Sequence, residues 1–330
     1  MKKILNKPEE YTDDMLRGIY AAHQGKVHFV SNDLRCYCIK DPEPGKVAII
    51  TGGGTGHLPL FLGYVGKNLL DGCAVGGVFQ SPSAEQIFSV TKAVEQGAGV
   101  LYLYGNYTGD IMNFDMAAEL CEFENIATRS IVGTDDIHSA PPEKANNRRG
   151  VAGIFFMYKC AGAKAAAKGT LDEVLAAAEK AKNNTRTVGF ALSPCIIPEV
   201  GHPNFVLSEG EMAMGMGIHG EPGIWNGPVK TAMSLAQDSV KAILADMPFQ
   251  GEAALLINGL GATSLEELYI LCGNVIEVFQ ENHIQIVKTY VGEFATSMEM
   301  AGASISVIQL DKEIKEWLAL PVNTPFYSSI

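Results

Sequence analysis

The sequence lacks the features that would assign it to a membrane or to a nucleic acid. Its 330 residues contain no uninterrupted apolar run of transmembrane length, and the short basic start is not followed by the apolar region of a signal peptide. There is no stripe of basic residues with interleaved aromatics, and the formal net charge is −12. Such a charge disfavours direct contact with nucleic acid or anionic membranes. We therefore expect partners of neither kind.

Cysteine is sparse and follows no pattern. The seven cysteines are odd in number and scattered, unlike a disulfide framework. We expect buried thiols in a reducing, cytoplasmic protein. Charged residues make up only 19 % of the chain and apolar residues 47 %, which excludes a disordered protein and predicts a sizeable core.

The remaining pattern is that of a two-domain α/β protein, because the chain is too long for one ordinary core and strand-like runs alternate with helical ones. Predicted strands cover residues 47–51, 73–79, 99–104, 128–132, 187–192, 212–218, 253–258, 284–291 and 305–310. Predicted helices cover residues 10–23, 83–95, 109–121, 152–167, 171–181, 229–245 and 264–280. A polar run at 182–186 predicts an N-terminal domain over 1–183 and a C-terminal domain over 184–330. We expect mixed sheets and an active site in the cleft between the domains.

The stretch from Met214 to Gly223 is the most informative part of the chain. Four glycines surround His219 there and would let another molecule approach the imidazole closely. A buried strand that ends at His219 would also fix the position of the ring, as a catalytic side chain requires. The alternative is a core histidine beside a turn.

A second glycine-rich turn, Gly52 to His57, follows the predicted strand at 47–51. Such a turn presents backbone N–H groups and excludes side-chain bulk. However, its glycine spacing and the early Pro59 do not match a dinucleotide fingerprint, and the lysine of a phosphate-binding loop is missing. An NAD-dependent oxidoreductase is therefore disfavoured.

Polar residues also follow the next two predicted strands. Ser81 comes after one strand and Asp110 after the other. Because the carboxyl ends of strands form the ligand crevice in open α/β sheets, we expect Gly54, His57, Ser81 and Asp110 to converge. Asp110 could instead cap the helix that follows it.

The run Asp135-Asp136-Ile137-His138 has the composition of a metal site. Ser-Ala-Pro-Pro follows it, and that sequence is typical of an exposed loop. We therefore predict a solvent-exposed loop rather than a metal site.

Several stretches together resemble the substrate-binding subunit of dihydroxyacetone kinases, the DhaK family. They are Gly52–His57, Phe79–Pro82, Asn106–Asp110, Arg149–Gly153, Ala191–Pro194, Gly217–Gly223, Asn258–Thr263 and Thr296–Gly302. The resemblance runs in order across nearly the whole chain. It implies a homodimeric, two-domain α/β protein.

The resemblance also implies the chemistry. His219 would bind a short ketose covalently, by addition of an imidazole nitrogen to the carbonyl carbon as a hemiaminal. Such a bond supplies the affinity that a small ketose lacks and rejects glycerol. Asp110 would accept the proton of the terminal hydroxyl that attacks phosphorus, and His57 would orient that hydroxyl. The expected substrate-binding residues are Gly54, Thr55, Ser81 and Gly105.

The chain departs from the common family pattern at two positions near these residues. Leu58 stands where the family often has Glu, and Gly105 where it often has Lys. Tyr104-Gly105-Asn106-Tyr107 looks like the branch associated with four-carbon ketoses such as erythrulose. Dihydroxyacetone and erythrulose therefore both stay open as substrates.

By resemblance, this chain binds no cofactor and no metal. ATP or ADP with Mg²⁺ would reside on a helical kinase subunit, which ATP or a phosphotransferase-system protein would supply with phosphate. A second role stays open, that of a ketose-sensing transcriptional coregulator without kinase activity. His57 and Asp110 favour the phosphotransferase, because a sensor needs only the groups that hold the sugar.

Overall fold

The computed structural model describes residues 2–329, which form two compact units. Unit 1 contains the residues up to Gly133, Met157–Ala181 and the residues from Glu316 on. Unit 2 contains Thr134–Phe156 and Lys182–Lys315. The chain therefore passes between the units four times, and the boundary expected at 183/184 lies beside one of these passages.

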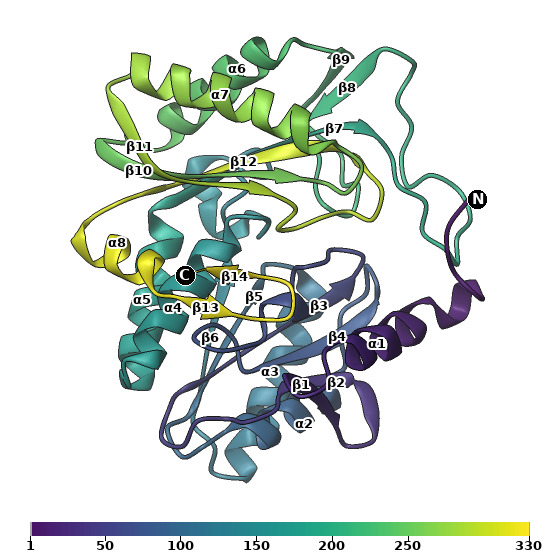
Figure 1. Ribbon diagram of the computed structural model, residues 1–330, viewed down its shortest axis with the longest axis vertical. Helices are drawn as coiled ribbons and strands as arrows, with labels where there is room; N and C mark the ends of the chain where they lie inside the picture. Colours follow the sequence, from purple (N-terminus) through teal and green to yellow (C-terminus); the bar gives the residue numbers. More distant parts are fainter. Residues whose placement is uncertain (1, 330) are drawn as a thin grey trace. The chain divides into compact units, whose positions relative to one another are not determined.

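Unit 1 is built on a six-stranded mixed sheet in the order β1-β2-β4-β3-β5-β6 (Figure 1). Its strands are β1 (Val27–Val30), β2 (Asp33–Ile39), β3 (Ala48–Thr55), β4 (Gly72–Val78), β5 (Val100–Gly105) and β6 (Thr128–Gly133). β3 to β6 are parallel to one another. β2 pairs antiparallel with both of its neighbours, β1 and β4. The carboxyl ends of β3, β4 and β5 consequently lie at one edge of the sheet.

The helices of unit 1 bury their apolar faces on this sheet. They are α1 (Tyr11–Ala22), α2 (Ala84–Val94), α3 (Thr108–Phe123) and most of α4 (Ile154–Ala166) and α5 (Leu171–Asn183). α2 and α3 pack on one face of the sheet, where Ile87 and Phe114 share a core with Tyr102 of β5. α2 begins at the predicted N-cap, Ser83, which forms a reciprocal capping box with Gln86.

Short elements complete this unit. They are the 3-10 helices η1 (Pro8–Glu10) and η2 (Leu62–Tyr64), the end of α8 (Lys312–Ala319), and the strand pair β13 (Val322–Asn323) and β14 (Ser328–Ser329).

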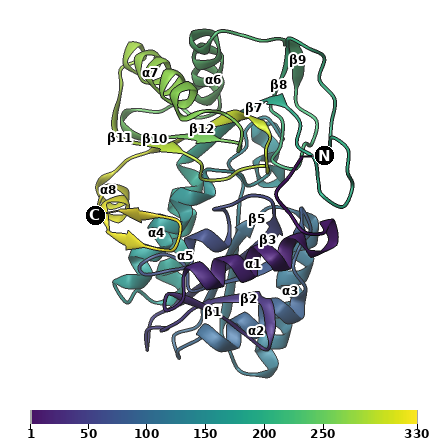
Figure 2. The ribbon, with the colours of Figure 1, turned by 45° about the vertical axis from the view of Figure 1, so that its right-hand side comes forward.

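Unit 2 is built on a second six-stranded sheet, in the order β11-β10-β12-β7-β8-β9. Its strands are β7 (Thr185–Ser193), β8 (Glu211–Met214), β9 (Trp225–Pro228), β10 (Gly251–Gly259), β11 (Ile284–Gly292) and β12 (Ala301–Gln309). Only β10 and β11 pair in parallel. The helices α6 (Ala232–Asp246) and α7 (Leu265–Glu281) lie side by side against this sheet (Figure 2), and the 3-10 helix η3 (Pro142–Asn147) lies in the loop before α4. Two mixed sheets with packed helices confirm the predicted α/β class.

The strand predicted at 212–218 is wrong in its second half. β8 ends at Met214, and Gly215 follows with φ of 75°. This left-handed conformation ends the extended backbone, and the N–H of Ile224 then donates to the carbonyl of Met214 (2.8 Å). His219 therefore lies in a loop between β8 and β9 and not at the end of a strand.

The β1–β2 hairpin is an element that the sequence did not predict. Its turn residues, Ser31 and Asn32, have φ of 57° and 54°. Hairpin turns of this kind usually carry Asn-Gly or Asp-Gly, so Ser-Asn gave little signal.

No helix within residues 2–329 is long and apolar enough to cross a membrane. All seven cysteines are buried, as their scattered distribution predicted.

Candidate functional site

The glycine-rich turn of unit 1 is shaped by close contact between two backbones. A Cβ atom on Gly54 would lie 2.7 Å from the amide nitrogen of Gln80 and 2.8 Å from Cα of Phe79. Because backbone atoms cannot move aside as a flexible side chain can, only glycine fits at this position. The N–H of Phe79 also donates to the carbonyl of Thr55 (3.0 Å), which holds the loop after β4 against the end of β3.

His57 lies in an aromatic environment directly after this turn. Its side chain is fully buried. The imidazole stacks on the Phe79 ring, with centroids 4.8 Å apart and planes at 15°, and it meets the Phe61 ring edge-on at 6.3 Å. Ring packing against Phe79 and Phe61 therefore helps to fix the position of His57.

Asp110 lies in the first turn of α3 and is buried. The N-cap of this helix is Tyr107, whose carbonyl accepts a hydrogen bond from the N–H of Ile111 (3.0 Å). The alternative that Asp110 caps the helix is therefore wrong. Asp110 thus lies at the N-terminus of α3, whose partial positive charge attracts negative groups.

Ser81 approaches the same helix turn. Its hydroxyl oxygen would lie 2.7 Å from a Cβ atom on Gly109, so Ser81 packs directly against the start of α3. The Asn113 side chain donates to the carbonyl of Pro82 (2.7 Å) and holds this loop in place. Gly54 therefore contacts the loop that carries Ser81, and Ser81 contacts Gly109, the residue before Asp110, at the carboxyl edge of the sheet.

The other two expected residues of unit 1 lie at the ends of their strands. Gly105 is the last residue of β5 and pairs with Gly133 of β6. Thr55 is the last residue of β3, and its hydroxyl lies 3.3 Å from the hydroxyl of Thr12 on α1. The side chain of Thr55 therefore faces α1, and it is the least suited of the expected residues to contact a substrate.

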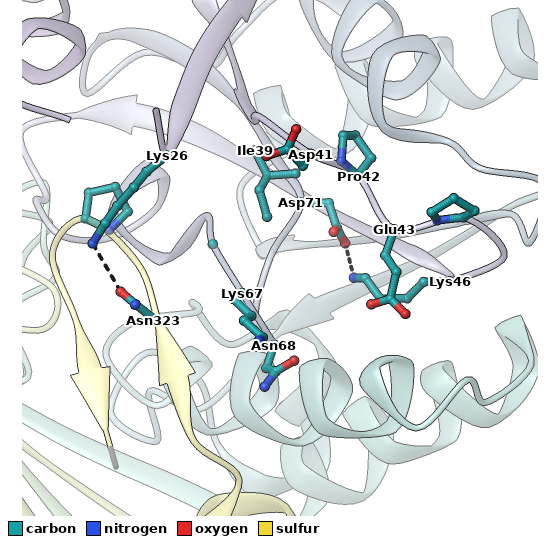
Figure 3. A pocket seen from close by; sticks show the side chains of 13 residues that line it. Lys26, Ile39, Asp41, Pro42, Glu43, Lys46, Lys67, Asn68, Asp71 and Asn323 are labelled. Atoms are coloured by element: carbon teal, nitrogen blue, oxygen red, sulfur yellow. Dashed lines mark hydrogen bonds and ion pairs between the residues drawn. The ribbon is translucent and has the colours of Figure 1, made fainter. Parts of the chain in front are cut away.

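A separate hollow of about 530 Å³ lies near the amino end of β3 (Figure 3). It is bordered by Lys26, Lys46, Lys67, Asp41, Glu43 and Asp71, among others. The buried ion pair between Lys46 and Asp71 (2.6 Å) forms one wall, and Asp71 also accepts from the N–H of Ile49 (2.8 Å). Lysines and acids occur here in equal number, so the wall does not select a ligand of one charge. None of the expected site residues borders this hollow.

In unit 2, His219 is bound to a carboxylate two residues further along the chain. Its Nδ1 lies 2.9 Å from Oε1 of Glu221, and its backbone N–H donates to Oε2 of the same residue (3.0 Å). The His219 side chain remains 24 % exposed and so is accessible to a small molecule. Burial works to raise the pKa of Glu221, but the hydrogen bond and charge of His219, together with Arg149, outweigh it and lower this pKa to about 2.

Two further charged side chains, Arg149 and Asp136, extend the interaction between His219 and Glu221. Arg149 lies 3.7 Å from Glu221 and 2.9 Å from Asp136, and it also donates to the carbonyl of Gly215 (2.9 Å). A Cβ atom at Gly217 would overlap with the Glu221 carboxylate and the Arg149 guanidinium. Glycine at this position leaves room for the charged groups to approach each other.

The backbone of the His219 loop is held by two polar side chains of unit 2. Asn204 donates to the carbonyl of His219 (3.0 Å), and the buried Ser297 donates to the carbonyl of Ile218 (2.5 Å). These two hydrogen bonds hold the backbone at Ile218 and His219, where no β-sheet pairing holds it.

The prediction of an exposed loop at Asp135 and Asp136 is wrong. Both side chains are buried. Asp135 accepts hydrogen bonds from the N–H groups of Val151 and Gly153 (3.0 and 2.8 Å), while Asp136 pairs with Arg149. Burial raises the pKa of Asp136 to about 7, and the Arg149 charge opposes this shift. In the described part of the chain, no group of three or more His, Cys, Asp or Glu side chains is arranged to hold a metal ion.

The comparisons with known proteins agree on the family. The profile of the Dak1 domain matches residues 17–326, most of the chain. The chain belongs to the Dak1 family. Among its Dak1 relatives, the dihydroxyacetone-binding subunit DhaK of the PTS-dependent dihydroxyacetone kinase 2 of Listeria innocua is 45 % identical, over 99 % of both chains. The D-erythrulose kinase of Mycolicibacterium smegmatis is 42 % identical over 99 % of this chain, which spans only 56 % of that kinase.

The chain is also similar to solved structures of other proteins. The dihydroxyacetone kinase of C. freundii in complex with AMP-PNP and Mg²⁺ matches with a TM-score of 0.92 at 30 % identity, over 99 % of this chain and 61 % of that one. The dihydroxyacetone kinase operon co-activator Dha-DhaQ matches with a TM-score of 0.88, also at 30 % identity, over 96 % and 97 % of the two chains. The expected resemblance to the DhaK family is thereby confirmed.

Sequence reasoning missed the groups that hold the two histidines. Glu221 lies within the stretch around His219, and its spacing of two residues was the available signal. Arg149 and Asp136 gave no such signal, because more than sixty residues separate them from His219 in the sequence. Phe61 was not singled out from the sequence, and Phe79 stood out only as part of the stretch Phe79–Pro82 that carries the family resemblance.

Proposed function

We propose that this chain is the ketose-binding subunit of a dihydroxyacetone kinase-like phosphotransferase and that it holds a short ketose covalently through His219. The pairing of His219 with Glu221 is the observation that carries this proposal. Because the Glu221 carboxylate accepts from Nδ1, the imidazole proton resides on Nδ1 and the lone pair on Nε2. The names of the Dak1 relatives, dihydroxyacetone-binding subunits and erythrulose kinases, support the substrate class.

Ketose capture follows from this tautomer. Nε2 attacks the carbonyl carbon, the C–N bond forms, and the electron pair of the C=O bond moves to oxygen. In the neutral hemiaminal, Nδ1 has lost its proton and the ketose oxygen has gained one, so atoms and charge balance. The Glu221 carboxylate stabilises the positive charge that the imidazole carries before that proton leaves.

The other residues act on the terminal hydroxyl of the same ketose. Asp110 accepts the hydroxyl proton as the oxygen attacks phosphorus, and His57 orients the hydroxyl. Gly54 has no side chain and so lets the ketose approach backbone N–H groups, and Ser81 supplies a hydroxyl that holds a ketose oxygen. Thr55 and Gly105 complete the proposed substrate-binding residues, with Thr55 acting through the backbone because its side chain faces α1.

The phosphoryl group comes from a partner in this proposal. The chain binds no nucleotide or metal cofactor itself, and a helical kinase subunit carries ATP or ADP with Mg²⁺. The similar Listeria protein is named as a subunit of a PTS-dependent enzyme, which favours a phosphotransferase-system donor. The similarity to erythrulose kinases keeps a four-carbon ketose as the alternative to dihydroxyacetone. We further propose a cytoplasmic homodimer.

A ketose-sensing coregulator is the second candidate function. The structural similarity to the co-activator Dha-DhaQ favours it, since that protein has a closely similar fold. Both functions use His219 for capture, but only the phosphotransferase needs a proton acceptor at Asp110.

The test is to combine the purified chain with the nucleotide-carrying kinase subunit of the same organism, its phosphoryl donor and Mg²⁺. Dihydroxyacetone, D-erythrulose, L-erythrulose and glyceraldehyde are then compared as substrates. We expect phosphorylation of at least one ketose and an intact-protein mass increased by one ketose. Capture without any phosphorylation would favour the coregulator.

A further inference from the structure

Unit 2 contains a buried ion pair, Asp136 with Arg149, one contact away from the carboxylate that binds His219. The Asp136 side chain is 4 % exposed and that of Arg149 is 13 % exposed. A buried ion pair contributes little net stability, because the cost of desolvating both charges offsets their attraction. Its place beside Glu221 points to a role in the chemistry of His219.

The Arg149 guanidinium uses its nitrogens on three different groups. Nε donates to Oδ2 of Asp136 (2.9 Å), and Nη2 lies 2.9 Å from the same oxygen. Nη2 also donates to the carbonyl of Gly215 (2.9 Å). Nη1 lies 3.7 Å from Oε2 of Glu221, which is too long for a hydrogen bond. Arg149 therefore acts on Glu221 through its charge while its hydrogen bonds go elsewhere.

Glu221 is the group for which His219 and Arg149 compete. Its Oε1 lies 2.9 Å from Nδ1 of His219, and its Oε2 accepts from the backbone N–H of the same residue (3.0 Å). While Asp136 is ionised, it holds Arg149 and offsets much of the positive charge of the guanidinium. Without that negative charge, Arg149 is free to close the 3.7 Å gap to Glu221. The lone pair on Nε2 depends on a proton held at Nδ1, so this competition acts on the attacking nitrogen.

Asp135, His138 and Arg149 face the Asp136 carboxyl. Burial raises the pKa of Asp136 to about 7; the Arg149 charge and the N–H of His138 oppose this shift, and the like charge of Asp135 adds to it. Burial, with the charges of Arg149 and Arg148, lowers the pKa of the His138 imidazole, so this ring is neutral and does not offset the Asp136 charge. Asp136 therefore exchanges its proton near neutral pH.

We propose that Asp136 and Arg149 are positioning residues for His219 and that protonation of Asp136 weakens ketose capture. The ionised carboxylate keeps Arg149 away from Glu221, and the protonated carboxyl releases it. Capture should therefore decline as pH falls through about 7. Protonation of His219 itself also stops the attack, since a protonated Nε2 has no lone pair, so the experiment must separate the two titrations. This inference rests on the proposed function, which supplies the capture step.

The first measurement needs no ketose. ¹⁵N NMR of the histidine-labelled full chain reports which nitrogen of His219 carries the proton, and the signals of this ring are assigned by their absence from His219→Ala. At about pH 8.5, above the pKa of Asp136, we expect the Nδ1–H form in the wild type. In Asp136→Asn we expect a shift toward the Nε2–H form, because the neutral amide releases Arg149.

Ser139→Ala is the matched control. The Ser139 hydroxyl accepts from the N–H of Arg149 (3.0 Å) and donates to the carbonyl of Asp136 (2.7 Å). Its removal therefore disturbs the same turn without changing a charge, and the tautomer of His219 should stay as in the wild type.

The second measurement is the ketose adduct, followed by intact mass as a function of pH. At about pH 8.5, Asp136→Asn should weaken capture about tenfold, as the loss of a group that orients a histidine through its partner usually does. It should also lose the step that the wild type and Ser139→Ala show near neutral pH. Arg149→Lys keeps the charge but not the guanidinium fork, so it should weaken capture as well.

Equal tautomers and equal capture in Asp136→Asn and the wild type would overturn the inference. So would the same shift in Ser139→Ala as in Asp136→Asn, because both would then act through the fold alone. If Asp136→Asn does not fold, the wild type carries the test: its capture should fall more steeply with pH than one titrating group allows, and a single-group profile would refute the role of Asp136. A wild type that forms no ketose adduct would reject the proposed function, whereas the tautomer shift in Asp136→Asn would still support the positioning role.

Discussion

His57 in unit 1 and His219 in unit 2 are proposed to act on the same ketose, but their surroundings differ in kind. His57 is fully buried and packed against the rings of Phe61 and Phe79. His219 is partly exposed and bonded to Glu221, which in turn lies beside Arg149. Ring packing holds a side chain in one position, whereas an ionised partner also determines which nitrogen carries the proton. In the proposed function, His57 of unit 1 orients the hydroxyl, and His219 of unit 2, held by Glu221, is the nucleophile.

The largest effect is expected from removal of the nucleophile. His219→Ala should abolish the ketose adduct and weaken ketose binding about 10³-fold, because a small polyol has little other surface to bind through. Intact mass spectrometry and calorimetry measure the two quantities, with His202→Ala, at an exposed histidine of unit 2, as the control. Equal ketose affinity in His219→Ala and the wild type would reject covalent capture.

The next effect separates chemistry from capture. Asp110→Asn keeps the shape of the side chain but removes the proton acceptor, so we expect phosphoryl transfer to fall about 10²- to 10⁴-fold. The ketose adduct should form as in the wild type. Steady-state rates with the kinase subunit and intact mass provide both measurements. Loss of the adduct in Asp110→Asn would contradict the assignment of capture to unit 2.

Two glycine substitutions compare the glycine-rich turn of unit 1 with the His219 loop of unit 2. Gly54→Ala forces a Cβ atom against the backbone of Phe79 and Gln80, and we expect a loss of about 1–3 kcal/mol in the free energy of unfolding. Gly217→Ala meets the flexible ends of Glu221 and Arg149, so it should cost less stability but displace Glu221 and weaken ketose capture.

Gly18→Ala on α1 is the matched control for these variants, because nothing lies within 4 Å of the new methyl group. It should leave capture unchanged and leave stability equal or higher by up to about 1 kcal/mol. Urea denaturation and adduct formation are measured for all three variants. A larger loss of stability in Gly217→Ala than in Gly54→Ala would contradict the contrast between the two units.

The smallest effect concerns acid pH. Glu221 has its pKa lowered from 4.5 to about 2 in the folded protein. An acid with a lowered pKa stabilises the fold fully above its unfolded pKa and loses that contribution as pH falls toward the folded pKa. The wild type should therefore lose on the order of 2 kcal/mol through Glu221 as pH falls from about 5 to about 2.

Glu221→Gln should remove this part of the pH dependence, as measured by urea denaturation across the same range. Glu266→Gln, at an exposed position on α7, serves as the control and should keep the slope of the wild type. If Glu221→Gln kept the wild-type slope, the charged support of His219 would be weaker than its geometry indicates.

Local patterns in the sequence were sufficient to predict much of this molecule. Apolar periodicity gave most helices and strands, and Ser83 marked the start of α2 because a capping box involves only neighbouring residues. The strand ends at Gly54, Ser81 and Asp110 could also be predicted, since parallel strands bring their carboxyl ends to one edge.

The errors arose where distant residues decide the local structure. The sequence around Asp135 and Asp136 is typical of a polar loop. Both side chains are nevertheless buried, because backbone N–H groups donate to Asp135 and Arg149 pairs with Asp136. The strand expected to reach His219 ends at Met214, and Gly215 follows it in a left-handed conformation with its carbonyl bound by Arg149. Neither arrangement is visible in a local window of sequence.

Unit 1 contains both the first residues of the chain and the segment from Glu316 on. Thr324 is buried and donates to the carbonyl of Gly63 (2.7 Å), and Asn323 pairs with Lys67. During synthesis, Lys182–Lys315 of unit 2 therefore emerges from the ribosome before unit 1 has received its final segment. Unit 1 is begun first and completed last, so a chain that stops near residue 315 would retain all of unit 2 but leave unit 1 without the contacts of its closing segment.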